Sequence, residues 1–286
     1  MHLFVRKMRR AEEILIRALM CGALALVGLG VGSVLWSVLS RGVPVLTWEM
    51  VSETPGSGFF IGGDGGFLNA IAGSVYIVVG SAVAGLAISL PIVFYLNVFL
   101  KQGSRLAYAL RLGLDVLFGI PSIVYGAFAF SVMVALGIRA SLLGGIIVET
   151  LLIIPIMARS MDEVARTAPR DLLEAAYSLG ATRLEAAKIL ARQTAPAIAT
   201  ATLLSVGRAM GDAAGVMFTA GFTDYVPESL TDKAATLPLA VFFQLSSPKA
   251  DVQARAFAAA VVLTAIVLAL SLTGRLAMRW FSKNKV

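Results

Sequence analysis

The chain has 286 residues, of which 58% are hydrophobic and 14% charged, and its formal net charge is +7. Soluble domains carry about 25% charged residues. A soluble enzyme is therefore not expected, and neither is a nucleic-acid-binding domain, because the basic residues lie between long apolar runs. The lone histidine, His2, and the lone cysteine, Cys21, exclude histidine-based catalysis, a zinc site and an internal disulfide.

Six apolar runs are long enough to cross the hydrocarbon layer of a membrane, which takes roughly 20 residues. The first is too long for a secretory signal core and ends without a clear cleavage site, so we expect it to be retained. The fold class predicted is an all-α integral membrane protein with six transmembrane helices. The runs comprise residues 18–39, 70–100, 116–138, 140–157, 196–222 and 256–274.

The orientation follows from lysine and arginine. Most of these 24 residues lie before run one, after runs two and four, and after run six. Cytoplasmic segments carry the excess of basic residues, so both termini are expected in the cytoplasm. The outer loops are then residues 40–69, whose glycine-rich stretch 52–66 predicts a flexible surface loop, and residues 223–253.

The cytoplasmic loop 159–195 has the pattern of a helical hairpin. Pro169 suits a helix start, residues 170–179 are good helix formers, and Gly180 suits a left-handed stop. Thr182 and Glu185 have the spacing of a capping box that opens a second helix. A charged hairpin beside a membrane predicts a docking partner; the alternative is a hairpin that only lies on the membrane surface.

Three charged residues fall inside the apolar runs. Arg208 and Asp212 are four positions apart, so a helix would place them on one face. They either form a structural salt bridge, or Arg208 presents its planar guanidinium to a passing anion. Glu149, deep in run four, is expected to be a structural residue that faces the interior, pairs with a base or is protonated.

The hairpin residues Glu174, Ala175, Ala176 and Gly180 resemble the EAA loop of ABC importer permeases. The string Glu-Ala-Ala and the glycine keep the family's spacing. The usual proline after the isoleucine is missing, because Ala191 follows Ile189 and Leu190. In that family the loop is a coupling helix seated in a groove of the ATPase subunit, so the resemblance implies that role for these four residues.

Further motifs, in chain order, resemble the phosphate-specific permeases of this family, the PstA type. Residues 119–126 read GIPSIVYG, which is similar to GIPSIVxG, and residues 207–214 read GRAMGDAA, which is similar to ARAxGETA. Residues 68–74 and Leu237-Pro238-Leu239 continue the match. The resemblance implies a single permease domain, 1–286, with a core of about 68–280 and the coupling loop 159–195.

In that branch the run-five motif is linked to phosphate passage, so the resemblance implies that Arg208 and Asp212 line an anion pathway. Asp212 stands where the family usually has glutamate. The resemblance also implies a location in the bacterial plasma (inner) membrane, among its lipids. The implied partners are a second permease of the PstC type, two ATPase subunits of the PstB type, an extracytoplasmic phosphate-binding protein of the PstS type, and phosphate itself.

The chain lacks a G-x-x-x-x-G-K-[ST] loop and any Gly-Lys pair. We therefore expect no enzymatic activity and no cofactor on this chain, with ATP and Mg²⁺ used by a partner subunit. The nearest alternative is a permease for another oxyanion, molybdate or sulfate. An intramembrane enzyme lacks an evident nucleophile, and a channel leaves the hairpin unexplained.

Overall fold

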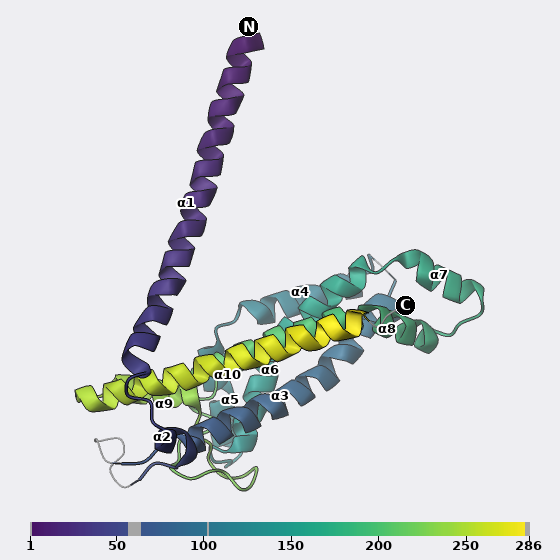
Figure 1. The fold of residues 1–286 in the computed structure, drawn as a ribbon. Helices are drawn as coiled ribbons and strands as arrows, with labels where there is room; N and C mark the ends of the chain where they lie inside the picture. Colours follow the sequence, from purple (N-terminus) through teal and green to yellow (C-terminus); the bar gives the residue numbers. More distant parts are fainter. Residues whose placement is uncertain (1, 57–63, 102, 284–286) are drawn as a thin grey trace.

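A computed structural model describes residues 2–56, 64–101 and 103–283 of the chain. These residues form helices and loops, with an isolated β-bridge between Pro55 and Gly65 (Figure 1). The helices are α1 (His2–Gly42), α2 (Trp48–Ser52), α3 (Leu68–Phe94), the π-helix η2 (Tyr95–Phe99), α4 (Arg105–Gly119), α5 (Ser122–Ala135), α6 (Leu142–Thr167), α7 (Arg170–Ser178), α8 (Arg183–Gly211), α9 (Leu237–Leu245) and α10 (Ala250–Lys283).

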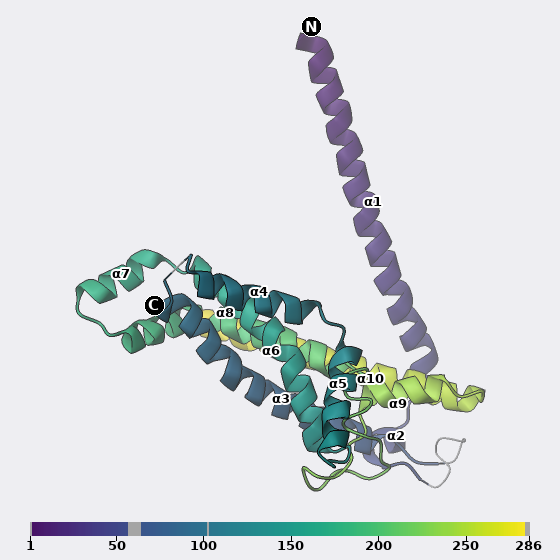
Figure 2. The same ribbon diagram turned by 180° about the vertical axis from the view of Figure 1, so that it is seen from behind.

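Helices α3, α6, α8 and α10 lie side by side, with α7 and the C-terminus at one end and α2 and α9 at the other (Figures 1 and 2). Helix α6 packs most extensively against α3. Glycines permit this close approach: a Cβ at position 80 would lie 2.8 Å from the Ile146 side chain, and one at position 85 would lie 2.9 Å from Ile153. The core beside this seam includes the fully buried Met157 and Met161.

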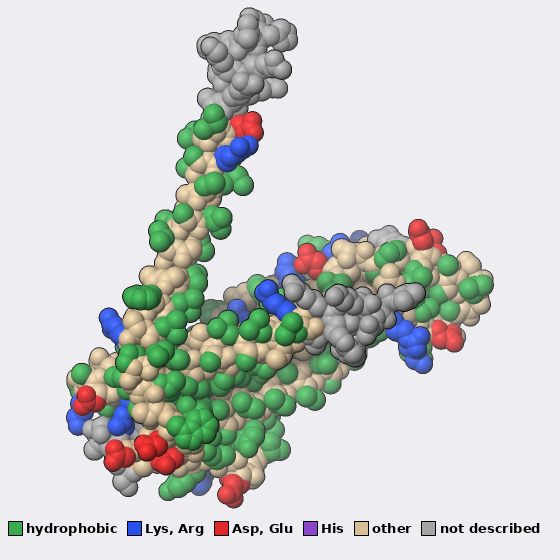
Figure 3. Space-filling model, in the orientation of Figure 1, with side chains coloured by type: hydrophobic (Ala, Val, Ile, Leu, Met, Phe, Trp, Pro, Cys, Tyr) green, Lys and Arg blue, Asp and Glu red, His purple; other side chains and the backbone are tan. Residues whose placement is uncertain are grey.

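Helix α1 diverges from the other helices (Figure 1). In the most apolar 18-residue stretch of its segment Glu12–Gly42, no residue is buried by the rest of the chain. Contact is limited to its end, where Gly42 meets the Phe257 carbonyl and the Arg41 guanidinium lies 5.1 Å from the Phe257 ring centroid. Figure 3 shows hydrophobic side chains along this helix, as expected for a segment surrounded by lipid or by another membrane chain.

By length and composition, four helices in the described residues can cross a membrane, or five if the bent pair α4–α5 is one span. The four are Glu12–Gly42, Leu68–Phe99, Leu142–Thr167 and Ala250–Leu276, which correspond to runs one, two, four and six. The prediction of an all-helical protein with several membrane spans is confirmed. Runs three and five do not form the single transmembrane helices expected.

Run three is broken. Helix α4 begins at Arg105, well before the expected start, and α5 leaves it at an angle of 96°. The break lies at Ile120 and Pro121, both in extended conformation, because a residue that precedes proline is disfavoured in a helix. The Tyr125 hydroxyl donates to the Leu117 carbonyl across the bend at 2.8 Å.

Run five is not one helix either. Helix α8 continues through Pro196, which was expected to open a new span, and ends at Gly211 instead of reaching residue 222. Asp212 caps it with an extended backbone (φ −80°, ψ 124°), and its carboxylate accepts the Gly215 N–H at 2.7 Å. Such a local side-chain bond competes with helix continuation. Arg208 and Asp212 therefore do not share a helix face.

The loops at the α2 and α9 end of the helices are held by side-chain bonds from α3. The Asn69 amide donates to the Thr223 carbonyl at 2.6 Å, and the Ser74 hydroxyl accepts the Leu237 N–H at 2.8 Å. Helix α9 lies within the predicted outer loop 223–253. Of the predicted flexible loop, residues 57–63, including Ser57, lie outside the described residues.

Candidate functional site

The turn after α8 packs between the start of α5 and the middle of α6. A Cβ at position 215 would lie 2.6 Å from Asp212 Oδ2, 3.6 Å from Val148 Cγ1 and 3.7 Å from the Ser122 carbonyl. On the other side, a Cβ at Gly126 would lie 2.6 Å from the Gly215 carbonyl. The two motifs that resemble phosphate permeases, about residues 119–126 and 207–214, therefore meet in space although they are far apart in the sequence.

Glu149 joins this junction from α6. Its side chain is fully buried, and neither carboxylate oxygen has a hydrogen-bond partner within the described residues. It lies within electrostatic range of the like charge of Asp212 and the opposite charge of Arg208. A buried polar group without a partner costs about 1–3 kcal/mol of folding stability. A Glu149 with a purely structural role would therefore destabilise the fold.

Arg208, in the last turn of α8, is exposed on the surface of this chain. Among the described residues it forms no ion pair within 4.0 Å, so the salt bridge with Asp212, one of the two alternatives for this pair, is not present. The reason is the helix end at Gly211, which turns Asp212 toward the Gly215 amide. The guanidinium is thus left available to another charged group at this surface.

The N-terminus of α5 lies at the same junction. The first helical N–H groups carry a partial positive charge and lack helical acceptors, which favours anions. Together the junction contains one guanidinium, one helix N-terminus and two carboxyl groups, those of Glu149 and Asp212. Within the described residues, no group of three or more His, Cys, Asp and Glu side chains is arranged to hold a metal ion.

The predicted helical hairpin is confirmed in detail. Gly180 adopts φ +85°, its N–H donates to the Tyr177 carbonyl at 3.0 Å, and the Ala181 N–H donates to the Ala176 carbonyl at 3.0 Å. These two bonds form the left-handed helix stop that glycine favours. The last alanine of Glu174-Ala175-Ala176 thus supplies the backbone carbonyl that the turn requires, four positions before the glycine.

The second helix of the hairpin opens with the predicted capping box. Glu185 Oε2 accepts the Thr182 N–H and hydroxyl, both at 2.8 Å, and these bonds hold the pKa of Glu185 below its ordinary value. Two apolar side chains are exposed at the turn, Leu179 at 90% and Leu184 at 67%. An ordered turn with exposed leucines has the form of a docking surface.

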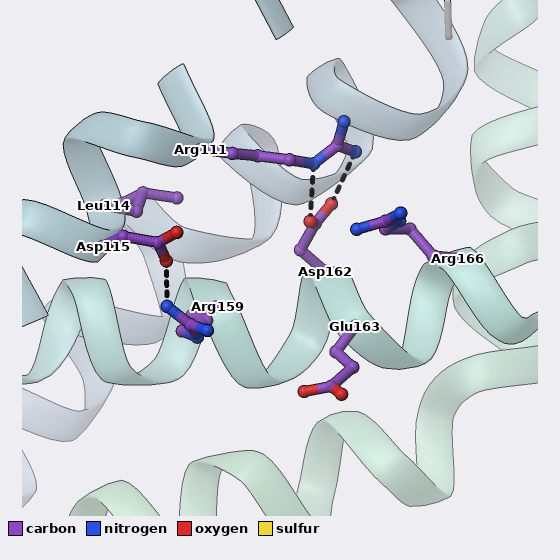
Figure 4. A pocket seen from close by; sticks show the side chains of 7 residues that line it. All are labelled: Arg111, Leu114, Asp115, Arg159, Asp162, Glu163 and Arg166. Carbon is purple, nitrogen blue, oxygen red and sulfur yellow. Dashed lines mark hydrogen bonds and ion pairs between the residues drawn. The ribbon is translucent and has the colours of Figure 1, made fainter. Parts of the chain in front are cut away.

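A polar network joins α4, α6 and η2 at the hairpin end of α6, and Figure 4 shows its ion pairs between α4 and α6. Asp162, which is 6% exposed, accepts Arg111 Nε at 2.7 Å and Arg111 Nη2 at 3.0 Å, and the Asn97 amide at 2.7 Å. A second ion pair joins Arg159 of α6 to Asp115 of α4. These charged residues line a cavity of about 170 Å³ together with Leu114, Glu163 and Arg166.

Asp162 was not identified from the sequence, and Arg111 was used only for orientation. The partners are 51 and 65 positions apart, so no local spacing relates them. The sequence signal is an acidic residue five positions after the end of an apolar run.

Residues 85–285 match the family described as binding-protein-dependent transport system inner membrane component. The phosphate transport system permease protein PstA of Pasteurella multocida is 31% identical over 245 residues, covering 85% of this chain and 86% of the relative. The corresponding protein of Haemophilus influenzae is 31% identical over 85% of both chains. PstA 2 of Mycobacterium bovis is 31% identical over 87% of this chain and 81% of the relative.

The fold also has a solved counterpart. A chain of the inward-facing MetNI methionine ABC transporter superposes with a TM-score of 0.57 over 74% of this chain and 95% of its own length. At 19% identity the likeness establishes the fold.

Proposed function

Because this chain belongs to the inner-membrane permeases of binding-protein-dependent transport systems, we propose that it forms half of the membrane pathway of an ATP-driven importer for inorganic phosphate. Its similarity to phosphate permeases over 85% of its length carries the proposal. Arg208 and the N-terminus of α5 support the proposal, because a phosphate binds to the planar donors of a guanidinium and to free backbone N–H groups.

The proposed topology has six spans with both termini in the cytoplasm. The bent pair α4–α5 is the third span and the apolar part of α8 with the turn after it is the fifth. Charge supports the orientation, because lysine and arginine concentrate at the ends and loops assigned to the cytoplasm. The C-terminus and α7 also lie at the same end of the helices (Figure 1).

The proposed assembly, in a bacterial plasma membrane, includes a second permease, two ATPase subunits and an external phosphate-binding protein. Arg208 is exposed on the surface of this single chain, so a pathway that it lines would need a second membrane chain to enclose it. The exposed Leu179 at the hairpin turn supports docking of an ATPase subunit. Glu174, Ala175, Ala176 and Gly180 are the proposed coupling residues. Without a phosphate-cradling loop, this chain leaves ATP hydrolysis to its partner.

Two helices connect the hairpin directly to the charged junction of Arg208, Asp212 and Glu149. Helix α6 carries Glu149 and ends at Thr167 beside the hairpin, and α8 begins in the hairpin and ends beside Arg208. Movement of the hairpin on ATP binding would therefore displace both helices that carry the charged junction. This is the proposed basis of alternating access to the anion.

The test is ATP-driven uptake of labelled phosphate by vesicles that contain the whole complex, with sulfate and molybdate as competitors. We expect uptake that phosphate itself suppresses and the other two do not. Arg208→Lys keeps the charge but loses the planar fork, so uptake per intact complex should fall at least tenfold, corresponding to about 1.4 kcal/mol. Suppression by molybdate or sulfate would instead identify the importer as one for that anion, and undiminished uptake by Arg208→Lys would remove Arg208 from the pathway.

A further inference from the structure

The cavity between α4 and α6 at the hairpin end of the helices is lined almost entirely by charged side chains (Figure 4). Leu114 is the one apolar residue among the seven that line it. Two of its guanidinium groups already have acidic partners. Arg111 pairs with Asp162. Arg159 pairs with Asp115. What the cavity can bind therefore depends on the charges that remain.

Arg166 supplies the remaining guanidinium. It is exposed, and among the described residues it has no acidic partner within 4.0 Å. Arg159, Asp162 and Arg166 share one face of α6, and Figure 4 shows Arg166 extending toward the pair of Arg111 and Asp162. Glu163 also lines the cavity, but Figure 4 shows its carboxylate turned away from Arg166. The wall that Arg166 faces therefore has three guanidinium groups and two carboxylates, an excess of one positive charge.

An apolar side chain continues the wall of the cavity away from the hairpin. Arg111, Asp115 and Phe118 lie on one face of α4, which leads from the hairpin end to the bend before α5. Phe118 is 46% exposed, and its ring centroid lies 5.8 Å from Arg159 Cζ. In the proposed orientation the site is therefore charged at the cytoplasmic surface and apolar deeper in the membrane. A phospholipid of the cytoplasmic leaflet presents its headgroup and its acyl chains in the same order.

We propose that this cavity binds the phosphate group of an anionic phospholipid from the cytoplasmic leaflet, with Arg166 as the main donor. A planar guanidinium can donate two parallel hydrogen bonds to phosphate oxygens, and Arg111 retains donors that Asp162 does not use. The excess positive charge matches the negative charge of a phosphodiester. Basic pockets between membrane helices on the cytoplasmic side bind lipid headgroups of this kind. The inference uses the proposed orientation and is independent of which anion is transported.

The experiment measures lipid binding to the whole purified complex by native mass spectrometry, with phosphatidylglycerol as the anionic probe and phosphatidylcholine as the zwitterionic one. We expect the wild-type complex to bind phosphatidylglycerol more tightly. Arg166→Gln removes the guanidinium without an acidic partner and leaves both ion pairs of the cavity in place. The affinity for phosphatidylglycerol should therefore fall about tenfold, with little change for phosphatidylcholine. Arg166→Lys keeps the charge but loses the planar fork, so its affinity should be intermediate.

Arg105→Gln is the matched control. Arg105 is also exposed and lies at the hairpin end of α4, but it is not among the residues that line the cavity. This variant should bind phosphatidylglycerol as the wild type does. Equal binding by the wild type and Arg166→Gln would overturn the inference. Displacement of the lipid by an equal concentration of inorganic phosphate would also overturn it, because the cavity would then be a site for the free ion. A complex that binds the lipid but fails to import phosphate would instead overturn the proposed function alone.

Discussion

At the scale of single residues, the hairpin depends on Gly180. Its φ of +85° is strained for any residue with a Cβ, although the space around it is open. Gly180→Ala should therefore cost about 1–2 kcal/mol at the turn without a steric clash. We expect normal membrane insertion and a reduced rate of ATP-driven phosphate uptake, because the docking turn loses its fixed shape.

Gly103→Ala provides the control for this prediction. Gly103 has a similar φ of +76° and equally open surroundings, but it precedes α4 and lies outside the hairpin. It should reproduce the strain without the transport defect. Equal uptake by the two variants, measured per intact complex with the ATPase bound, would contradict the coupling role of Gly180.

At the scale of elements, Asp162 binds α4, α6 and η2 together next to the hairpin. Helix α4 leads directly to the bend before α5, so this contact connects the hairpin end of α6 to the charged junction. Asp162→Asn leaves the Arg111 guanidinium without its charged partner, at a cost of about 1–3 kcal/mol. We expect fewer phosphate ions imported per ATP hydrolysed, with ATP hydrolysis itself retained.

The neighbouring pair Arg159–Asp115 joins the same two helices but is about half exposed on both sides. Exposed pairs contribute little, so Asp115→Asn should leave the ratio of phosphate to ATP nearly unchanged. The double change Arg111→Gln with Asp162→Asn should recover part of the ratio, because neither charge then remains unpaired. An unaltered ratio in Asp162→Asn would show that the network only supports the fold.

At the scale of the whole molecule, the six-span topology can be tested by labelling. Cys21 is the only native cysteine, so a Cys21→Ser background accepts single cysteines at chosen positions. An impermeant thiol reagent applied from outside should label positions 57 and 229, and should reach positions 104 and 178 only after the membrane is opened. External labelling of position 178 would place the hairpin on the wrong side for an ATPase and would refute the orientation.

Local chemistry was readable from the sequence alone. The helix stop at Gly180 and the capping box of Thr182 and Glu185 were predicted correctly, because each depends on residues within a few positions of one another. Apolar runs likewise predicted an all-helical membrane protein, since the hydrocarbon layer imposes their length. The motifs predicted the permease family, which the comparisons confirm.

Tertiary structure decided the site. The helix expected to carry both Arg208 and Asp212 ends between them, and the turn after it packs against α5 and α6. The charged neighbours of Glu149 and Asp162 lie on other parts of the chain, and local spacing in the sequence does not reveal them. The sequence determined that the long apolar segments become helical, because that depends on near neighbours and on the membrane. The folded chain alone decided which charges meet, because that depends on how the helices bend and pack.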